Sequence, residues 1–343
     1  MYMAPKKAFI TGIAGQDGYY LSELLLQKGY EVHGLVRTKS APSVARLSQK
    51  ITLHEGSLTD FVRVAQILSE IQPDEIYNLA AQSSVAMSFT QPDETWAVNY
   101  DAVGNLVTEA LLYNPSVRIY QASTSEMFGN VPAPQNEMTP FSPQSPYAES
   151  KAKAHEDFIV AKRGEGAYTV SGILFNHESP LRGTQYVTRK ITSSLARIAT
   201  GLQDVLELGN LNAVRDWGHA EDYVRAMYLM LQQETPEDYA IASGVAHSVR
   251  EFVEIAGKNL DIGIEWEGEG IDEIGRNKKT GNIVVKVNPS FYRPTEVNFI
   301  QGDSSKAHEK LGWYPEYSFE DIVTQMVKVD IELVEQENKR QSK

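Results

Sequence analysis

Short apolar segments alternate with helical segments over the first half of the chain, and this alternation constrains the fold most strongly. Strand-like runs are expected at 8–11, 30–37, 51–55, 75–80, 117–122 and 170–175, and helices at 19–28, 61–71, 96–113 and from 147 to about 162. Strands separated by helices form βαβ units, in which the strands lie parallel in one sheet. The sequence therefore predicts an α/β fold with a Rossmann-type, doubly wound parallel sheet.

The regular alternation ends after Asn176. Helices are expected at 187–200, 219–232, 248–259, 304–311 and 319–334, with two short strand-like pieces within 261–287. We predict a cofactor-binding Rossmann domain over residues 1–175, with a return segment around 211–243, and a smaller mixed α/β substrate domain over 176–343. The cleft between two such domains is the expected place for a ligand.

Composition narrows the class of protein. The 343 residues carry a formal net charge of −13, which argues against a general nucleic-acid binder. The absence of cysteine removes disulfides, thiolate metal sites and thiol catalysis. No apolar run approaches the length needed to cross a bilayer, and the first residues lack the apolar core of a signal peptide. We expect a cytoplasmic enzyme with no membrane partner.

Three glycines follow the first expected strand and precede the first expected helix. Gly12, Gly15 and Gly18 form the pattern G-x-x-G-x-x-G. In this context glycines let the backbone approach a pyrophosphate, and the helix N-terminus supplies N–H donors. The alternative is a tight structural turn without a ligand.

The residues after the second strand bear on the choice of nicotinamide cofactor. An acidic residue there binds the ribose hydroxyls of NAD, whereas a basic residue accommodates the 2′-phosphate of NADP. Here the strand ends at Arg37, with Lys39 close behind. This pattern favours NADP, and the alternative is a solvated surface arginine.

The stretch from Gln121 to Lys151 contains the candidate catalytic residues. Tyr147 and Lys151 are four positions apart, so on a helix they lie one turn apart on one face. An ammonium near a phenol favours the phenolate, which makes Tyr147 a candidate general base. Polar residues from Ser123 to Glu126 follow a strand, at the sheet edge where open α/β sheets bind ligands. An ordinary amphipathic helix start is the alternative.

Taken together, these motifs resemble those of the extended short-chain dehydrogenase/reductase family and, within it, the GDP-mannose 4,6-dehydratases. The similar segments, with x at positions that are not part of the resemblance, are GIAGQDGYYL, LAAQS, STSEMFG, YAESK, FNHESPxRG, VTRKI, LGNLxAxRDWGHAxDYV, SVREFVE and YRPTEV. Leu181 and Ser84 depart from the usual pattern of these dehydratases, in which an arginine and a histidine are common at those positions. The resemblance extends from Ile10 to about Trp313.

The resemblance assigns roles residue by residue. It implies a catalytic group of Thr124, Ser125, Glu126, Tyr147 and Lys151. It implies that NADP is bound by Gly12, Ile13, Ala14, Gly15, Gln16, Asp17, Arg37, Ser57, Leu58, Leu79, Ala80, Ala81, Gln82, Ser83, Tyr100, Lys151, His177 and Arg182. It implies that the nucleotide sugar is bound by Ser84, Asn176, Lys190, Arg215 and Arg293. No metal ligand set is expected, and a homodimer or homotetramer is implied.

The implied reaction is dehydration of GDP-mannose through a transient ketone at C4. Removal of a proton beside that ketone requires a carboxylate, which a plain epimerase does not need, so Glu126 is the residue that discriminates between the two. Three alternatives remain open: the same dehydration of GDP-manno-heptose, an epimerase or reductase of the same family, and a cofactor-binding sensor without catalytic activity.

Overall fold

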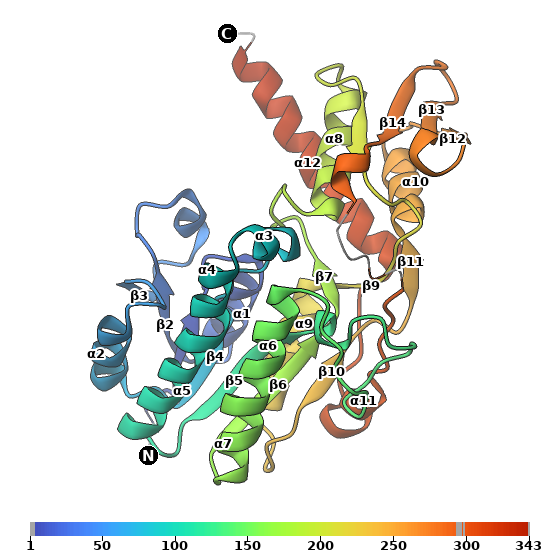
Figure 1. The fold of residues 1–343 in the computed structure, drawn as a ribbon. Helices are drawn as coiled ribbons and strands as arrows, with labels where there is room; N and C mark the ends of the chain where they lie inside the picture. The colour runs from blue at the N-terminus through green and yellow to red at the C-terminus, as the bar shows by residue number, and fades with distance from the viewer. Residues whose placement is uncertain (1–3, 293–296, 298, 342–343) are drawn as a thin grey trace. The chain divides into compact units, whose positions relative to one another are not determined.

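The computed structural model describes residues 4–292, 297 and 299–341 (Figure 1). These residues form two compact units. The first unit comprises Met1–Phe175, Ala220–Ala242 and Gly302–Tyr314, and the second comprises Asn176–His219, Ser243–Gln301 and Pro315–Lys343.

The first unit is built on a seven-stranded sheet in which every neighbouring pair is parallel. Its strand order is β10-β6-β5-β4-β1-β2-β3. The strands are β1 (Lys7–Thr11), β2 (Glu31–Val36), β3 (Thr52–Glu55), β4 (Glu75–Asn78), β5 (Arg118–Thr124), β6 (Tyr168–Leu174) and β10 (Tyr239–Ile241). The order runs outward in both directions from β1 and β4, so this pair marks the point at which such sheets bind ligands. The predicted doubly wound sheet is confirmed.

Helices cover both faces of this sheet, as Figure 1 shows. One face packs against α1 (Gln16–Gln27) and α9 (Ala220–Met230), and the other against α2 (Phe61–Ile71) and α5 (Ala102–Tyr113). The remaining helical segments are α3 (Val85–Thr90), α4 (Pro92–Trp96), η2 (Ala97–Asp101), α6 (Pro146–Ala154), η4 (His155–Val160), α7 (Ala161–Gly164) and α11 (Ser305–Leu311). Two of the helices expected from the sequence, 96–113 and 147–162, each contain a π-helical turn, η2 and η4.

The second unit has two small sheets around its own apolar core. The first sheet has the order β11-β9-β7 and the second has the order β12-β13-β14-β8. The strands are β7 (Asn176–Glu178), β8 (Leu206–Leu208), β9 (Val214–His219), β11 (Ala246–Ser248), β12 (Ile264–Glu267), β13 (Ile274–Asn277) and β14 (Ile283–Val287), and the helices are α8 (Val187–Ala199), α10 (Val249–Asn259) and α12 (Phe319–Gln341). A capping box between Ser248 and Glu251 begins α10, as the sequence predicts.

One segment was assigned to the wrong domain from the sequence. Residues 302–314 were expected in the second domain, but they pack within the first unit. Ser304 accepts a hydrogen bond from the Ala242 amide, and the Trp313 indole donates one to the Asp222 carbonyl. Both partners lie far away in the sequence, which explains why local patterns do not reveal this return.

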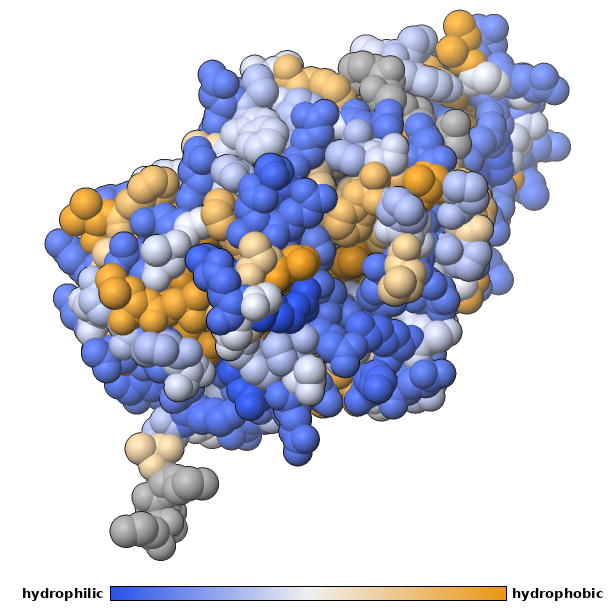
Figure 2. Space-filling view, turned by 60° about the horizontal axis from the view of Figure 1, so that its bottom comes forward, coloured by the Kyte–Doolittle hydropathy of each residue, from blue (hydrophilic) through white to orange (hydrophobic). Residues whose placement is uncertain are grey.

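Hydrophilic residues cover most of the face seen in Figure 2, and hydrophobic residues form separate patches on it. Within the described part of the chain, no helix combines the length and the apolarity needed to span a membrane.

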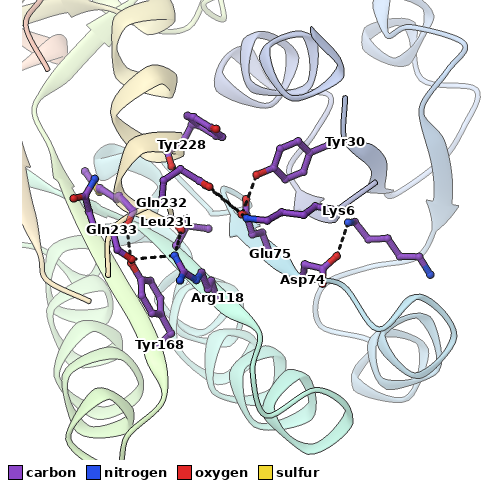
Figure 3. Close-up of polar contacts among 12 residues, drawn as sticks. Lys6, Tyr30, Asp74, Glu75, Arg118, Tyr168, Tyr228, Leu231, Gln232 and Gln233 are labelled. Carbon is purple, nitrogen blue, oxygen red and sulfur yellow. Dashed lines mark hydrogen bonds and ion pairs between the residues drawn. The ribbon is translucent and has the colours of Figure 1, made fainter. Parts of the chain in front are cut away.

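At the amino ends of the central strands, one buried carboxylate collects several hydrogen-bond donors (Figure 3). The first residue of β4, Glu75, is fully buried. It accepts hydrogen bonds from Lys6 at 2.9 Å, Tyr30 at 3.0 Å, Tyr77 at 2.8 Å and Gln232 at 3.2 Å. The carboxylate thus connects the start of the chain, β4 and the end of α9, and it raises the pKa of the Tyr30 phenol together with burial.

Glu75→Leu is expected to destabilise the protein by ~3 kcal/mol, because it leaves the fully buried Tyr77 hydroxyl without its acceptor and removes the hydrogen bonds from Lys6, Tyr30 and Gln232 as well. Tyr30→Phe removes one of these hydrogen bonds and should cost about 1 kcal/mol. Thermal unfolding midpoints measure both effects. Glu70→Leu, at an exposed position on α2, is the control and should stay within about 0.5 kcal/mol of the wild type. A Glu75→Leu protein as stable as this control would contradict the prediction.

Candidate active site

The glycine-rich turn lies between β1 and α1 and leaves its backbone open to a ligand. Gly12 has φ +68°, and a Cβ there would lie 2.9 Å from the Ala80 amide nitrogen. A Cβ on Gly18 would lie 2.4 Å from the Ile13 Cα, so this glycine lets α1 pack closely on the turn. Gly15 is the N-cap of α1. Residues 12–17 therefore form a cradle at a helix N-terminus that fits a pyrophosphate.

The segment after β4 borders this cradle. Leu79 and Ala80 donate their backbone N–H groups to the Thr11 hydroxyl at 3.2 and 3.1 Å. The backbone N–H of Gln82 donates to Asn99 at 3.0 Å, and its side chain accepts from the Ser84 amide at 2.6 Å. These bonds hold 79–84, the stretch that includes Ala81 and Ser83, beside the glycine turn.

Of the remaining predicted cofactor contacts of the first unit, Arg37, Ser57 and Leu58 follow the ends of β2 and β3, whereas the Tyr100 ring packs against Phe158 of η4. Arg37 directly follows β2 and is exposed, and among the described residues it has no hydrogen-bond or ion-pair partner. Ser57 is hydrogen-bonded to Thr59, and Leu58 is buried. Tyr100 donates to Asp157 at 2.8 Å, which fixes its ring on η2. An unpaired arginine at the end of β2 is suited to an anionic ligand group.

The end of β5 carries the predicted polar catalytic residues. Thr124 closes the strand, and its hydroxyl accepts the Glu126 amide at 3.2 Å. Ser125 begins the short helix η3 (Ser125–Phe128) and is buried, whereas Glu126 is half-buried. The hydrogen bond at Thr124 caps η3, so this short helix begins directly at the end of β5.

Tyr147 and Lys151 lie on α6, which packs against η3. The helix begins because Ser145 caps it, accepting the Ala148 amide at 3.1 Å, and Pro146 occupies its first position. Tyr147 is 9% exposed and Lys151 is 4% exposed. The Lys151 ammonium donates to the Ala122 carbonyl at 2.9 Å. Burial lowers the pKa of Lys151 to about 8.

The second unit contains the other predicted ligand contacts. Lys190 lies on α8, with its ammonium 3.6 Å from the centre of the Phe291 ring, and burial lowers its pKa. Arg215 on β9 is 7% exposed. Asn176 begins β7, opposite Trp217 of β9. These two cations and one amide belong to the second unit, and each is a side-chain type that binds phosphate.

His177 and Arg182 lie at the start of the same unit. His177 is in β7. The Arg182 guanidinium lies 3.1 Å from the buried carboxylate of Glu178 and 3.7 Å from the Tyr186 ring centre. Arg293 lies outside the described residues. Among the described residues, no group of three His, Asp or Glu side chains could hold a metal ion.

Sequence reasoning missed the polar residues that support these groups. Thr11 and Asn78 are buried at the ends of β1 and β4, Gln121 is buried in the middle of β5 in register with Asn78, and hydrogen bonds connect all three. Glu178, which orients Arg182, was also missed. The available signal was a polar residue within each buried strand, where packing alone would favour an apolar one.

Comparison with known proteins identifies the family. Residues 9–326 match the family model described as GDP-mannose 4,6 dehydratase. The chain belongs to the GDP-mannose 4,6-dehydratase family. It is 49% identical to the GDP-mannose 4,6 dehydratase of Drosophila melanogaster, over 96% of this chain and 87% of that protein. It is 48% identical to the GDP-mannose 4,6-dehydratase of Yersinia enterocolitica, over 96% of this chain and 95% of that protein.

Solved structures agree with the fold of this family. A UDP-glucose 4-epimerase of Thermotoga maritima superposes with a TM-score of 0.81 at 24% identity, covering 96% of this chain and 99% of that one. A dTDP-glucose 4,6-dehydratase of Bacillus anthracis superposes with a TM-score of 0.77 at 20% identity, covering 96% and 98%. These likenesses show the fold of an extended short-chain dehydrogenase/reductase.

Lys151→Met should stabilise the protein at pH 7. The ordinary lysine pKa of 10.5 falls to about 8 here, so holding the buried ammonium costs on the order of 3 kcal/mol below pH 8. As the pH rises from 8 to 10.5, the folded protein releases this proton while the unfolded chain keeps it, and the penalty disappears. The advantage of the variant should therefore be largest at pH 7 and shrink by pH 10.

Thermal melts of both proteins at the two pH values measure this difference. Lys153→Met, at a more exposed lysine on the same helix, is the matched control and should show no such gain. A Lys151→Met protein with a lower melting temperature than the wild type at pH 7 would refute the claim that the buried ammonium destabilises the folded protein.

Proposed function

We propose that this protein converts GDP-mannose to GDP-4-keto-6-deoxymannose and water. The observation that carries the proposal is the packing of η3, with Glu126, against α6, with Tyr147 and Lys151. A phenol beside a lysine suits removal of a proton from an alcohol. A carboxylate in the same cluster suits removal of a proton beside a ketone, which is the step that separates dehydration from epimerisation.

Each residue has one task in this proposal. Tyr147, as phenolate, takes the proton of the sugar 4-hydroxyl, and the Lys151 ammonium favours that phenolate. Thr124 holds the same hydroxyl by a hydrogen bond. Glu126 takes the C5 proton, which the neighbouring ketone has made acidic, and passes it to the 6-hydroxyl, which leaves as water. When hydride returns to C6, C5 regains a proton from Tyr147, which holds the one taken from the 4-hydroxyl.

The open cradle at residues 12–17 fits a dinucleotide, and we propose NADP. Held there, NADP would supply reversible hydride transfer, with C4 of the sugar as the donor and C6 as the final acceptor, so the overall reaction would be redox-neutral. The exposed guanidinium of Arg37 is available for the 2′-phosphate.

Substrate recognition belongs to the second unit in this proposal. Lys190 and Arg215 supply positive charge for the diphosphate of the GDP-sugar, and Asn176 supplies an amide. The Lys190 ammonium contacts only a half-exposed aromatic ring and has no carboxylate hydrogen-bonded to it among the described residues. Phosphate oxygens are stronger partners for it than that ring.

Two alternative activities share this geometry. Dehydration of GDP-manno-heptose needs additional room near C6, and an epimerase or reductase needs no carboxylate at Glu126. Incubation of the purified protein with each GDP-sugar, followed by mass spectrometry, separates them. We expect GDP-mannose to lose one water without added cofactor. If only GDP-manno-heptose is dehydrated, it is the substrate in place of GDP-mannose. A product that is an isomer of unchanged mass would indicate an epimerase.

Glu126→Gln should separate the two halves of the reaction. The amide keeps the size of the side chain but cannot accept the C5 proton. In a single turnover we expect absorbance of reduced nicotinamide and a 4-keto hexose, with no dehydrated product and no deuterium at C5 in deuterated water. Dehydration at the wild-type rate would remove Glu126 from this role.

Arg37→Ala should abolish most of the preference for NADP over NAD. One charge-assisted contact is typically worth roughly 1.5–3 kcal/mol, which sets the expected loss. Titration calorimetry of both cofactors measures it. Lys28→Ala, at the opposite end of α1, is the control and should leave the preference intact. Equal affinities in the wild type would contradict the choice of NADP.

A further inference from the structure

A directed chain of buried hydrogen bonds runs from the carboxyl ends of β1 and β4 to the middle of β5 and ends where Lys151 is anchored. Thr11 donates to the Asn78 carbonyl oxygen at 2.5 Å. Asn78 donates its amide N–H to the Gln121 carbonyl oxygen at 2.7 Å. Gln121 in turn donates to the backbone carbonyl of Ala122 at 2.9 Å, and Lys151 donates to this same oxygen at 2.9 Å.

The direction of these hydrogen bonds is set at Thr11, the residue farthest from Lys151 in the series. The Thr11 hydroxyl already accepts two backbone N–H groups, from Leu79 and Ala80. Its one hydrogen therefore goes to the Asn78 oxygen, which leaves the Asn78 amide hydrogens for Gln121. Gln121 must then present its own N–H to Ala122. Such aligned bonds polarise one another, so the last donor is strengthened.

Two donors thus share one acceptor at the catalytic group. A carbonyl oxygen has two lone pairs, and the Ala122 oxygen uses them for the Gln121 amide and the Lys151 ammonium. Each donor draws electron density from the same oxygen, and their hydrogens repel one another. The Gln121 donor therefore weakens the hold of Ala122 on the ammonium.

We propose that Gln121, oriented by Asn78 and Thr11, is a positioning residue that limits how tightly the Ala122 carbonyl holds Lys151. The ammonium remains free to direct its other N–H groups toward Tyr147 and the cofactor. No other hydrogen-bond acceptor meets it among the described residues. The inference rests on the proposed role of Lys151 in the dehydratase reaction.

Removing the Gln121 donor should make Lys151 hold its proton more firmly. Gln121→Met keeps the length of the side chain without the N–H, so the Ala122 oxygen becomes a better acceptor for the ammonium. The pKa of Lys151, which burial lowers to about 8, should then rise by about half a unit to one unit, the equivalent of one hydrogen bond.

Other titratable side chains lie on α6 and on the elements packed against it, and the substitution changes none of them. They are Tyr147, Glu149 and Lys153 on α6, Glu126 on η3, Tyr100 and Asp101 on η2, His155, Glu156 and Asp157 on η4, Asp93 and Glu94 on α4, and Arg118 and Tyr120 on β5.

The test reads Lys151 directly by NMR titration of protein labelled with ¹³C at the lysine Cε. Its signal is assigned by its loss in Lys151→Met. We expect the titration midpoint of the Lys151 signal to rise to a higher pH in Gln121→Met and to remain unchanged in Ser171→Ala. The control removes another buried side-chain hydrogen bond of the sheet, the 2.6 Å bond to Ser123, which does not involve Ala122. An unchanged or lower midpoint in Gln121→Met would overturn the proposal.

A second variant and a second readout complete the test. Asn78→Leu frees the Gln121 amide to rotate and should move the midpoint in the same direction, so it decides the question if Gln121→Met does not fold. In steady state, Gln121→Met should lower kcat by about threefold to tenfold with KM for GDP-mannose unchanged. A wild type that does not turn over GDP-mannose would refute the proposed function, and the titration would still decide the role of Gln121.

Discussion

A lysine ammonium held away from water, against a single carbonyl, is the constraint on which the candidate active site depends. Lys151 can occupy this position because α6 packs over the end of β5 and the Ala122 carbonyl remains available to it. Burial lowers its pKa to about 8, which places its titration close to neutrality. Holding the buried ammonium costs folding free energy, and in the proposed function the same ammonium favours the phenolate of Tyr147.

The parallel sheet separates this site from the features that stabilise the first unit. The glycine turn and the polar residues Thr124 and Glu126 lie at the carboxyl ends of the strands, where the candidate site is located. At the amino ends, the buried carboxylate of Glu75 joins the chain terminus, β4 and α9 (Figure 3). Because all strands run the same way, substitutions at the amino ends should change stability, whereas substitutions at the carboxyl ends should change activity and, at the buried Lys151, stability as well.

Much of this arrangement could be predicted from local patterns. Six of the seven strands of the first unit, the glycine turn and the one-turn spacing of Tyr147 and Lys151 follow from periodicity and motif alone, whereas the three-residue strand β10 was not predicted. The Thr11–Asn78–Gln121 chain could not be predicted, because its members are separated by 67 and 43 positions in the sequence and meet only when β1, β4 and β5 align. The packing of 302–314 on the first unit was missed for the same reason.

The central claim is that one sugar molecule loses water without any net oxidation. GDP-mannose carrying deuterium at C4 tests it most directly, with the dehydrated product analysed by mass spectrometry and NMR. The expected result is a product that retains the label, now at C6 of the same molecule. A dehydrated product that has lost the deuterium would contradict the claim.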